Sequence, residues 1–232
     1  MKRLLSTMQL NALLQLRYGL IYAAGFTLLM WIAVLRPLPV DLLQVAVPFA
    51  LFADLAMIGF YFIAGAVLFE KDERTLYALV TTPLRFGEYL AAKLLTLTLL
   101  AVLLCVLLVL AAYGSGFNPF WLVLGAALCS LIGLLAGFIA VAPFRSISDF
   151  ILPSGLILLP LGLPLVDFLG IWHSPLFYLI PTHGSLLLLR AAFAPISAGQ
   201  IAYAIAYQLL WIGLLVWIAQ KAFDRYIVSR GG

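Results

Sequence analysis

The stretch that decides the fold is YLAAKLLTLTLLAVLLCVLLVLAAY, residues 89–113, in which Lys93 is the one charged residue. A transmembrane helix requires about 20 mostly apolar residues, because each residue advances the helix by about 1.5 Å. This stretch is therefore long and apolar enough to cross a membrane. Five other stretches have the same character: residues 19–35, 42–69, 120–144, 150–168 and 201–219. The sequence predicts an all-α integral membrane protein with six transmembrane helices.

The composition excludes a soluble fold and indicates one domain. Hydrophobic residues make up 66% of the 232 residues and charged residues only 9%, against roughly 25% charged residues in an ordinary soluble domain. The apolar stretches are continuous rather than alternating over about ten residues, which excludes a transmembrane β-barrel. Because the connections are short, we expect a single membrane domain over residues 1–232, with no separate soluble catalytic domain.

The positions of Lys and Arg predict the orientation in the membrane. With the amino terminus inside, eleven of the 13 basic residues fall on the cytoplasmic side, and only Arg36 and Arg190 fall outside. Cytoplasmic loops carry such an excess of basic residues, so we expect both termini in the cytoplasm and the protein in the inner (plasma) membrane. The net charge of +4 then reflects topology and attraction to anionic lipid rather than nucleic-acid binding.

The first 18 residues, MKRLLSTMQLNALLQLRY, predict an amphipathic helix in the cytoplasmic interface. Leucine and methionine recur at about helical spacing, with basic and amide side chains between them. This pattern is typical of helices that lie along a membrane surface. The alternative is that the segment extends the first span.

A charged cytoplasmic connection, FEKDERTLYALVTTPLRFGEYLAAK at residues 69–93, joins the second and third spans. It holds four of the nine acidic and four of the 13 basic residues. Leu76, Leu79 and Val80 form an apolar stripe at helical spacing, and Pro83 is expected to end that helix. The mixed charge favours docking into a groove on a partner protein, because a helix that seeks lipid would be mainly basic. We predict that residues 69–88 form this docking loop.

The outer connection at residues 170–200 is apolar and aromatic, yet it is too broken to cross a membrane. The residues that interrupt it are Pro175, Pro181, Gly184 and Pro195. A re-entrant hairpin that dips into the outer leaflet explains both properties, provided that protein shelters its irregular backbone.

Residues inside the spans provide a candidate substrate path. Asp54 is the one acidic residue well inside a span, where a charge costs about 2.5 to 3.5 kcal/mol on insertion scales. We expect it to face the protein interior or a wet cavity, where it binds a substrate cation, gates the path through a hydrogen bond or makes a structural contact. Phe52 and Tyr61 lie nearby. Pro160 lies in the proline-rich fifth span, as a static kink or as a flexing element near the path.

The sequence shows no motif for chemistry of its own. It contains neither a G-x-x-x-x-G-K-[ST] phosphate loop nor a G-x-S-x-G nucleophile turn, so we expect a protein that is not an enzyme and that binds no cofactor or metal. Asp167, His173 and His183 have no metal-ligand spacing. Gly133 and Gly137 place small residues for close helix packing, with a dimer contact as the alternative.

The cytoplasmic connection resembles the permeases of the type-2 ABC exporter superfamily. The matching residues are Glu70, Glu73, Thr75, Leu76, Leu79, Thr82, Pro83 and Lys93. The six spans, the amphipathic amino-terminal helix and the re-entrant hairpin extend the resemblance over nearly the whole chain. Within the superfamily, ERTLYALVTTPLRFGEYLAAKLLTLTLL looks most like drug exporters of the fluoroquinolone type.

The resemblance implies a permease subunit that exports an amphiphilic or drug-like molecule. In that family the segment at residues 70–84 is a coupling helix, which seats in a separate nucleotide-binding subunit present in two copies. ATP and Mg²⁺ are bound by that partner, and the permease pairs with a second copy or a paralogue. The residues expected to couple to the ATPase are Glu70, Glu73, Arg74, Thr75, Leu76, Leu79 and Pro83. The alternatives are an ion-coupled secondary carrier and an intramembrane enzyme.

Overall fold

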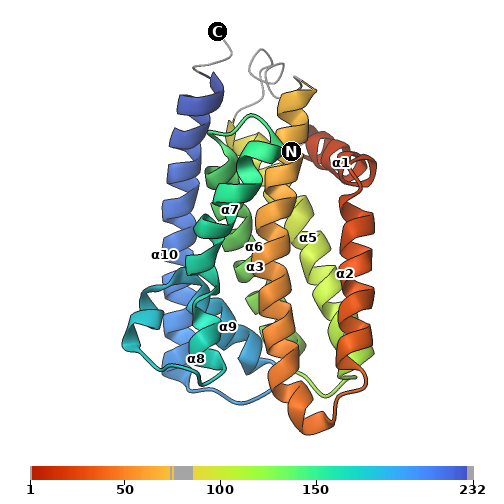
Figure 1. Ribbon diagram of the computed structural model, residues 1–232, viewed down its shortest axis with the longest axis vertical. Helices are drawn as coiled ribbons and strands as arrows, with labels where there is room; N and C mark the ends of the chain where they lie inside the picture. Colours follow the sequence, from red (N-terminus) through yellow and green to blue (C-terminus); the bar gives the residue numbers. More distant parts are fainter. Residues whose placement is uncertain (1, 74, 76–85, 229–232) are drawn as a thin grey trace.

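The computed structural model describes residues 2–73, 75 and 86–228, and the regular elements within these ranges are all helical. They form an elongated bundle (Figure 1). In chain order they are α1 (Lys2–Arg17), α2 (Leu20–Leu35), α3 (Val40–Asp72), α5 (Phe86–Ala112), α6 (Pro119–Val141), α7 (Ile147–Gly162), α8 (Pro164–Phe168), η1 (Pro175–Leu179), α9 (Pro181–Ala191), α10 (Ala198–Phe223) and η2 (Asp224–Val228). The predicted all-α class is confirmed for this part of the chain.

Four of these helices are long and apolar enough to cross a membrane, namely α3, α5, α6 and α10. The pair α1 and α2 gives a fifth candidate if the two count as one span, although they are bent by 64°. Helix α7 is apolar but has only 16 residues. The described residues thus form a multi-pass membrane protein with four or five candidate spans, and the predicted total of six remains a prediction.

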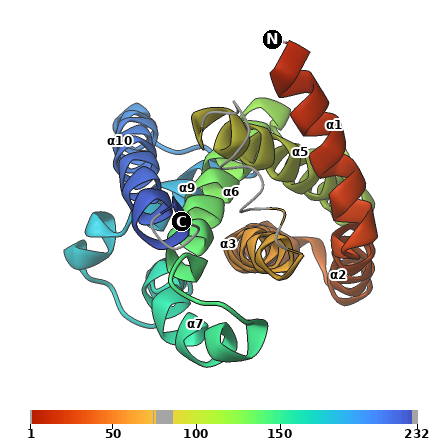
Figure 2. The same cartoon turned by 90° about the horizontal axis from the view of Figure 1, so that it is seen from above.

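The helix ends that flank the charged connection lie at one end of the bundle, together with the end of α10. The end of α3, the start of α5 and the end of α10 lie at one end of the bundle, whereas α8, α9 and the turn between α2 and α3 lie toward the other (Figure 1). Seen along the bundle, α2 and α10 stand on opposite sides with α3 and α6 between them (Figure 2). Helix α6 packs against α3, α5, α9 and α10, and it is the centre of the fold.

Close packing of α3 on α6 depends on two glycines of α6. A methyl group at Gly137 would collide with the carbonyl oxygen of Phe60 and lie 2.8 Å from Ile63 Cγ2, and one at Gly133 would lie 3.2 Å from the carbonyl oxygen of Ala56. Small residues allow such close helix approach. The prediction that this glycine pair serves packing is confirmed, and the partner helix belongs to the same chain.

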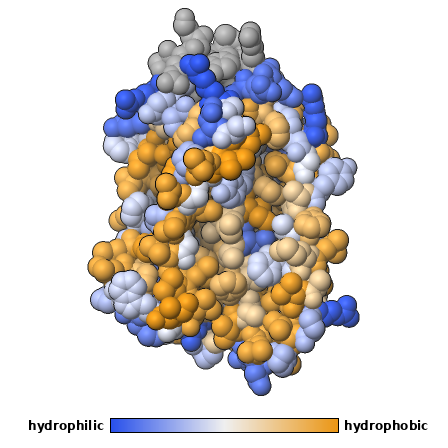
Figure 3. All heavy atoms as spheres, in the orientation of Figure 1, coloured by the Kyte–Doolittle hydropathy of each residue, from blue (hydrophilic) through white to orange (hydrophobic). Residues whose placement is uncertain are grey.

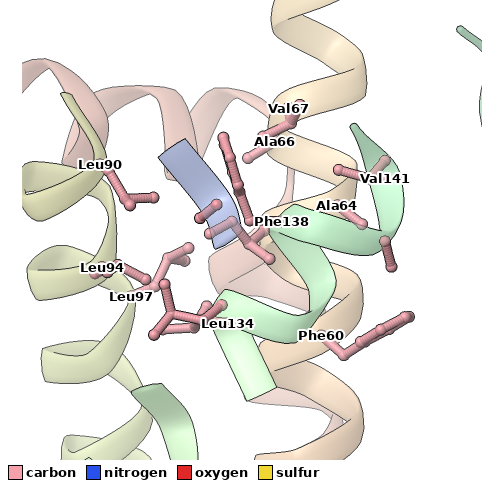
Figure 4. Packing of buried hydrophobic residues seen from close by; sticks show 14 of the residues in the cluster. Phe60, Ala64, Ala66, Val67, Leu90, Leu94, Leu97, Leu134, Phe138 and Val141 are labelled. Carbon is pink, nitrogen blue, oxygen red and sulfur yellow. The ribbon is translucent and has the colours of Figure 1, made fainter. Parts of the chain in front are cut away.

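The core near the end of α3 and the start of α5 fills the space between α3, α5 and α6. Leu134 and Phe138 of α6 point between the other two helices, toward Ala66 of α3 and Leu94 of α5, whereas Phe60 of α3 points away from α5 (Figure 4). All five side chains are at least nine-tenths buried. Because packing rather than hydrophobicity distinguishes helix contacts from lipid contacts in a bilayer, these interlocked side chains hold the three helices in register.

Helix α1 turns its polar face toward the protein. Gly19, with φ of 76°, interrupts the helical backbone between α1 and α2. Asn11 and Gln15 are buried, and Gln15 Nε2 donates a hydrogen bond to Thr96 Oγ1 of α5 at 2.9 Å. Leu13, in contrast, is 64% exposed. Helix α1 is therefore a separate element that packs its amide side chains on α5 and presents leucines outward.

The predicted fifth span, residues 150–168, consists of two helices in the structure. Helix α7 ends at Gly162, and α8 begins at Pro164, which has no N–H to continue the hydrogen-bonding pattern. The carbonyl of Leu161, in the last turn of α7, accepts a hydrogen bond from Thr182 Oγ1 of α9 at 2.7 Å. A contact from the segment that follows thus holds the break between the two helices in place.

The segment at residues 170–200 carries a helix buried inside the bundle. Residues 182–189 of α9 are all buried, and α9 packs on α3, α6 and α10. Ser185 Oγ donates to Gln208 Oε1 of α10 at 2.6 Å, and Tyr207 Oη donates to the carbonyl of Leu179 at 2.7 Å. These bonds supply partners for polar groups that lipid could not satisfy.

Candidate functional site

Asp54 occupies the middle of α3 and faces α2. It is partly buried, and its Oδ1 accepts a hydrogen bond from Trp31 Nε1 at 3.1 Å. Among the described residues Asp54 makes no ion pair. An acidic group inside a span usually faces the protein interior or a cavity, and this one does both.

Asp54 lines a pocket between α3, α5 and α6. The cavity volume is about 20 Å³, and the pocket is partly open to the outside. The lining residues are Asp54, Leu55, Ile58, Gly59, Phe62, Leu97, Leu100, Ala101, Leu104, Ser130 and Leu134. Ser130 is fully buried, and its Oγ has no hydrogen-bond partner among the described residues. The pocket is apolar apart from one carboxyl group and one hydroxyl group.

The other residues of the predicted substrate path do not join this pocket. Phe52 is fully buried in a core that also contains residues of α5, α6 and α9. The Tyr61 hydroxyl lies 3.2 Å from Ser154 Oγ of α7, and Pro160 is exposed on α7. The structure thus brings Asp54 together with Trp31 and Ser130, which the sequence did not single out for this role, rather than with its sequence neighbours.

Glu70, near the end of α3, lies inside the bundle. Its side chain is 5% exposed and its Oε2 lies 2.7 Å from Lys93 Nζ of α5, whose side chain is 2% exposed. Tyr89 Oη donates to the same oxygen at 2.6 Å. The pair ties the end of α3 to the start of α5, on either side of the charged connection. The sequence hinted at it only by placing an acid and a base at adjoining span ends.

Glu73 lies at the surface and links α3 to α1. Its carboxylate lies 3.2 Å from Arg17 Nη2 and accepts a hydrogen bond from Tyr18 Oη at 2.9 Å. Thr75 Oγ1 donates to the carbonyl of Glu70 at 3.1 Å. The other predicted coupling residues, Arg74, Leu76, Leu79 and Pro83, lie outside the described residues, and their role remains a prediction.

Lys71 is a residue that sequence reasoning missed. It is buried, and its Nζ donates to the carbonyls of Ala142 and Phe144 at 2.8 Å each and to that of Val141 at 3.3 Å. The last carbonyls of a helix lack partners within the helix and attract cations. Lys71 therefore fastens α3 to the end of α6. Its position in the last turn of a long apolar helix was the only signal in the sequence.

The two histidines differ in exposure and in their direct contacts. His173 Nδ1 lies 2.9 Å from Asp167 Oδ1 at the surface. His183 is buried in α9, where its ring packs against Tyr178 with 4.3 Å between ring centroids. Within the described part of the chain, no three His, Cys, Asp or Glu residues gather as metal ligands do. His173 thus contacts Asp167 directly, whereas His183 is buried and interacts with the same carboxylate at longer range.

The chain resembles known export permeases along its whole length. It matches the fluoroquinolones export permease protein family over residues 2–231. Two curated proteins named fluoroquinolones export permease protein, from Mycobacterium tuberculosis strains CDC 1551 / Oshkosh and ATCC 25618 / H37Rv, are each 43% identical to it over 238 residues. The alignments cover 100% of this chain and 99% of each relative. This chain therefore belongs to the fluoroquinolones export permease protein family.

Proposed function

We propose that the chain is the membrane-spanning permease subunit of an ATP-driven exporter that moves an amphiphilic, drug-like molecule outward. The observation that carries the proposal is the full-length match to a family of export permeases. The two relatives bear the name of fluoroquinolones export permeases, and we extend that substrate class to this chain. The polar groups of Asp54 and Ser130 in an apolar pocket support a transport role.

We propose six spans, formed by α2, α3, α5, α6, the pair α7 and α8, and α10. The 16 residues of α7 measure about 24 Å along a helix, which is less than the hydrocarbon thickness of about 30 Å. The five residues of α8 add about 8 Å if they continue the same path. Helix α1 then lies in the interface, and residues 170–200 form the re-entrant hairpin, with α9 sheltered by its neighbours.

The proposed orientation has both termini and the charged connection in the cytoplasm of a cell with the protein in its inner (plasma) membrane. It rests on the eleven-to-two bias of basic residues. The end of α3 and the start of α5, which flank the charged connection, also lie at the same end of the bundle as the end of α10 (Figure 1). Cysteines at Ser115 and Ser174 should react with an impermeant thiol reagent applied to intact cells, and a cysteine at Thr75 should react only after lysis. Labelling of position 75 in intact cells contradicts this orientation.

The energy is proposed to come from a separate ABC ATPase, present in two copies, which binds ATP and Mg²⁺ and docks on residues 69–88. The permease then acts as a pair with itself or a paralogue. Two internal contacts would allow force on this segment to reach the membrane helices. Lys71 fastens α3 to α6 and the buried pair of Glu70 and Lys93 fastens α3 to α5, so a push on the segment moves three helices that line the Asp54 pocket.

Replacing Leu76 and Leu79 together with Asp tests the docking. Unpaired charge would be buried against the partner, at a cost of several kcal/mol, while the membrane helices remain unchanged. We expect normal expression, failure to co-purify with a co-expressed ABC ATPase, and loss of ATP-dependent drug export from cells.

The matched control is the same double change at Leu176 and Leu179, which are each 64% exposed on η1 at the other end of the bundle. This control should retain the ATPase. If the variant at Leu76 and Leu79 also retains it and exports normally, the docking proposal fails, and export driven by an ion gradient becomes the better explanation.

A further inference from the structure

We infer that the pocket between α3, α5 and α6 binds the protonated amine of a lipophilic cation, with the Asp54 carboxylate as counter-ion and Ser130 as a second polar contact. The inference rests on the proposed function and deepens it, because it names the part of a substrate that this chain recognises. Four observations carry it: the placement of the carboxylate, its orientation, the buried hydroxyl and the apolar wall.

Asp54 is the one residue of the pocket lining that can carry a charge. A carboxylate in apolar surroundings needs a counter-charge or several hydrogen-bond donors, and Asp54 receives only the Trp31 hydrogen bond from the described residues. That bond occupies Oδ1 and fixes the carboxylate, leaving Oδ2 for another donor. An ammonium group supplies both the missing charge and the missing donor.

Ser130 gives independent support from another helix that lines the pocket. Its hydroxyl belongs to α6, is 0% exposed and has no hydrogen-bond partner among the described residues. Leaving a buried polar group unsatisfied is unfavourable by an amount comparable to a hydrogen bond. A ligand that places a donor between α3 and α6 satisfies this hydroxyl and the Asp54 carboxylate together.

The rest of the lining selects what accompanies the ammonium group. Leucines of α5, together with Ile58 and Phe62 of α3, form the wall, which suits hydrocarbon or an aromatic ring. The cavity of about 20 Å³ has room for about one group of the size of a water molecule. It therefore holds only the ammonium head, while the body of the molecule lies in the opening of the pocket. Figure 3 shows a depression with hydrophilic atoms at its base midway along a largely hydrophobic face.

This arrangement predicts charge selectivity. The lining offers no positive group to meet a carboxylate of the ligand, so cations should bind better than neutral molecules of the same shape and anions should bind worst. The recognised end of a zwitterionic drug would be its amine.

The test measures binding to the purified full-length chain in phosphatidylcholine nanodiscs, without ATP or an ATPase, after subtraction of binding to empty nanodiscs. The probes are naphthylmethylamine, its neutral isostere naphthylmethanol and anionic naphthylacetate at neutral pH. Hydrogen bonds to charged groups are among the stronger ones, so the amine should bind about tenfold or more tightly than the alcohol. Asp54→Asn should abolish this preference, Asp54→Glu should retain part of it, and Ser130→Ala should weaken amine binding a few-fold.

Asp41→Asn is the matched control, because Asp41 lies in the first turn of the same helix and outside the pocket. It should keep the full preference for the amine. Equal binding of amine and alcohol to the unaltered chain overturns the inference, as does an undiminished preference in Asp54→Asn. Because no ATPase is present, this result is separate from the docking experiment: amine preference without ATP-dependent export contradicts the proposed function alone, and export without amine preference contradicts the pocket alone.

Discussion

Breaking the buried ion pair between Glu70 and Lys93 should destabilise the protein far more than breaking the exposed pair one turn away. The Glu70 and Lys93 side chains are 5% and 2% exposed, with 2.7 Å between Oε2 and Nζ. At an effective dielectric constant of about 20, Coulomb's law gives an attraction of about 6 kcal/mol at this distance, part of which offsets desolvation. Removing one member leaves the other charge buried without its partner, and such changes lower the free energy of unfolding by about 3 to 5 kcal/mol.

The assay compares Lys93→Met, Glu70→Gln and the double variant by the free energy of unfolding of the purified chain in bicelles. We expect a loss of about 3 to 5 kcal/mol for Lys93→Met and partial recovery in the double variant, because no isolated charge then remains. Glu73→Gln is the control. Its partner Arg17 has a side chain that is 70% exposed, and exposed pairs contribute about 0 to 1 kcal/mol. A loss for Lys93→Met no larger than that for Glu73→Gln would refute this reasoning.

Two further predictions concern helix contacts. Gly137→Ala should lower the free energy of unfolding by about 1 to 3 kcal/mol, because the added methyl group meets the Phe60 carbonyl. The control Gly213→Ala has nothing within 4 Å of the added methyl group and should be neutral or slightly stabilising. Equal effects of the two variants in the same unfolding assay would contradict the close packing of α3 on α6. Thr182→Val should lower the free energy of unfolding by about 1 kcal/mol, because it removes the hydrogen bond to the Leu161 carbonyl. Thr182→Ser keeps the hydroxyl and should retain most of that stability. A Ser variant as unstable as the Val variant would show that the methyl group, rather than the hydroxyl, stabilises this contact.

The sequence alone predicted the membrane class, most of the long helices and the family. A run such as residues 89–113 becomes a spanning helix because its own length and hydropathy favour that state, whatever surrounds it. The predicted second span, residues 42–69, lies within α3, Val40–Asp72. The amphipathic start, residues 1–18, corresponds to α1, Lys2–Arg17. The charged motif at residues 69–93 pointed to a drug-export permease, and the full-length family match confirms that resemblance.

The candidate site needed the tertiary structure. The sequence identified Asp54 as unusual, because a lone acid in an apolar run is costly wherever that run packs. Its contacts with Trp31 on α2 and the pocket that it shares with Ser130 on α6 depend on how three helices are rotated about their axes and how deeply each sits. Hydropathy is nearly the same all around such helices and does not encode that rotation. The steric fit between helices determines the rotation. Gly137, for example, allows the backbone of α3 to approach α6 closely.

The division between sequence and tertiary structure is sharpest in α1 and the fifth span. The pattern of α1 determines that it is amphipathic, but only packing decides that Asn11 and Gln15 turn toward α5 while leucines face outward. Proline content indicates that the fifth span is strained, yet the break after Gly162 is stabilised by Thr182, about twenty residues further along the chain. Local composition determines which segments enter the membrane, because transfer into lipid is a property of each segment. Pairing between segments depends on the shapes of both partners, and only the folded structure brings those shapes together.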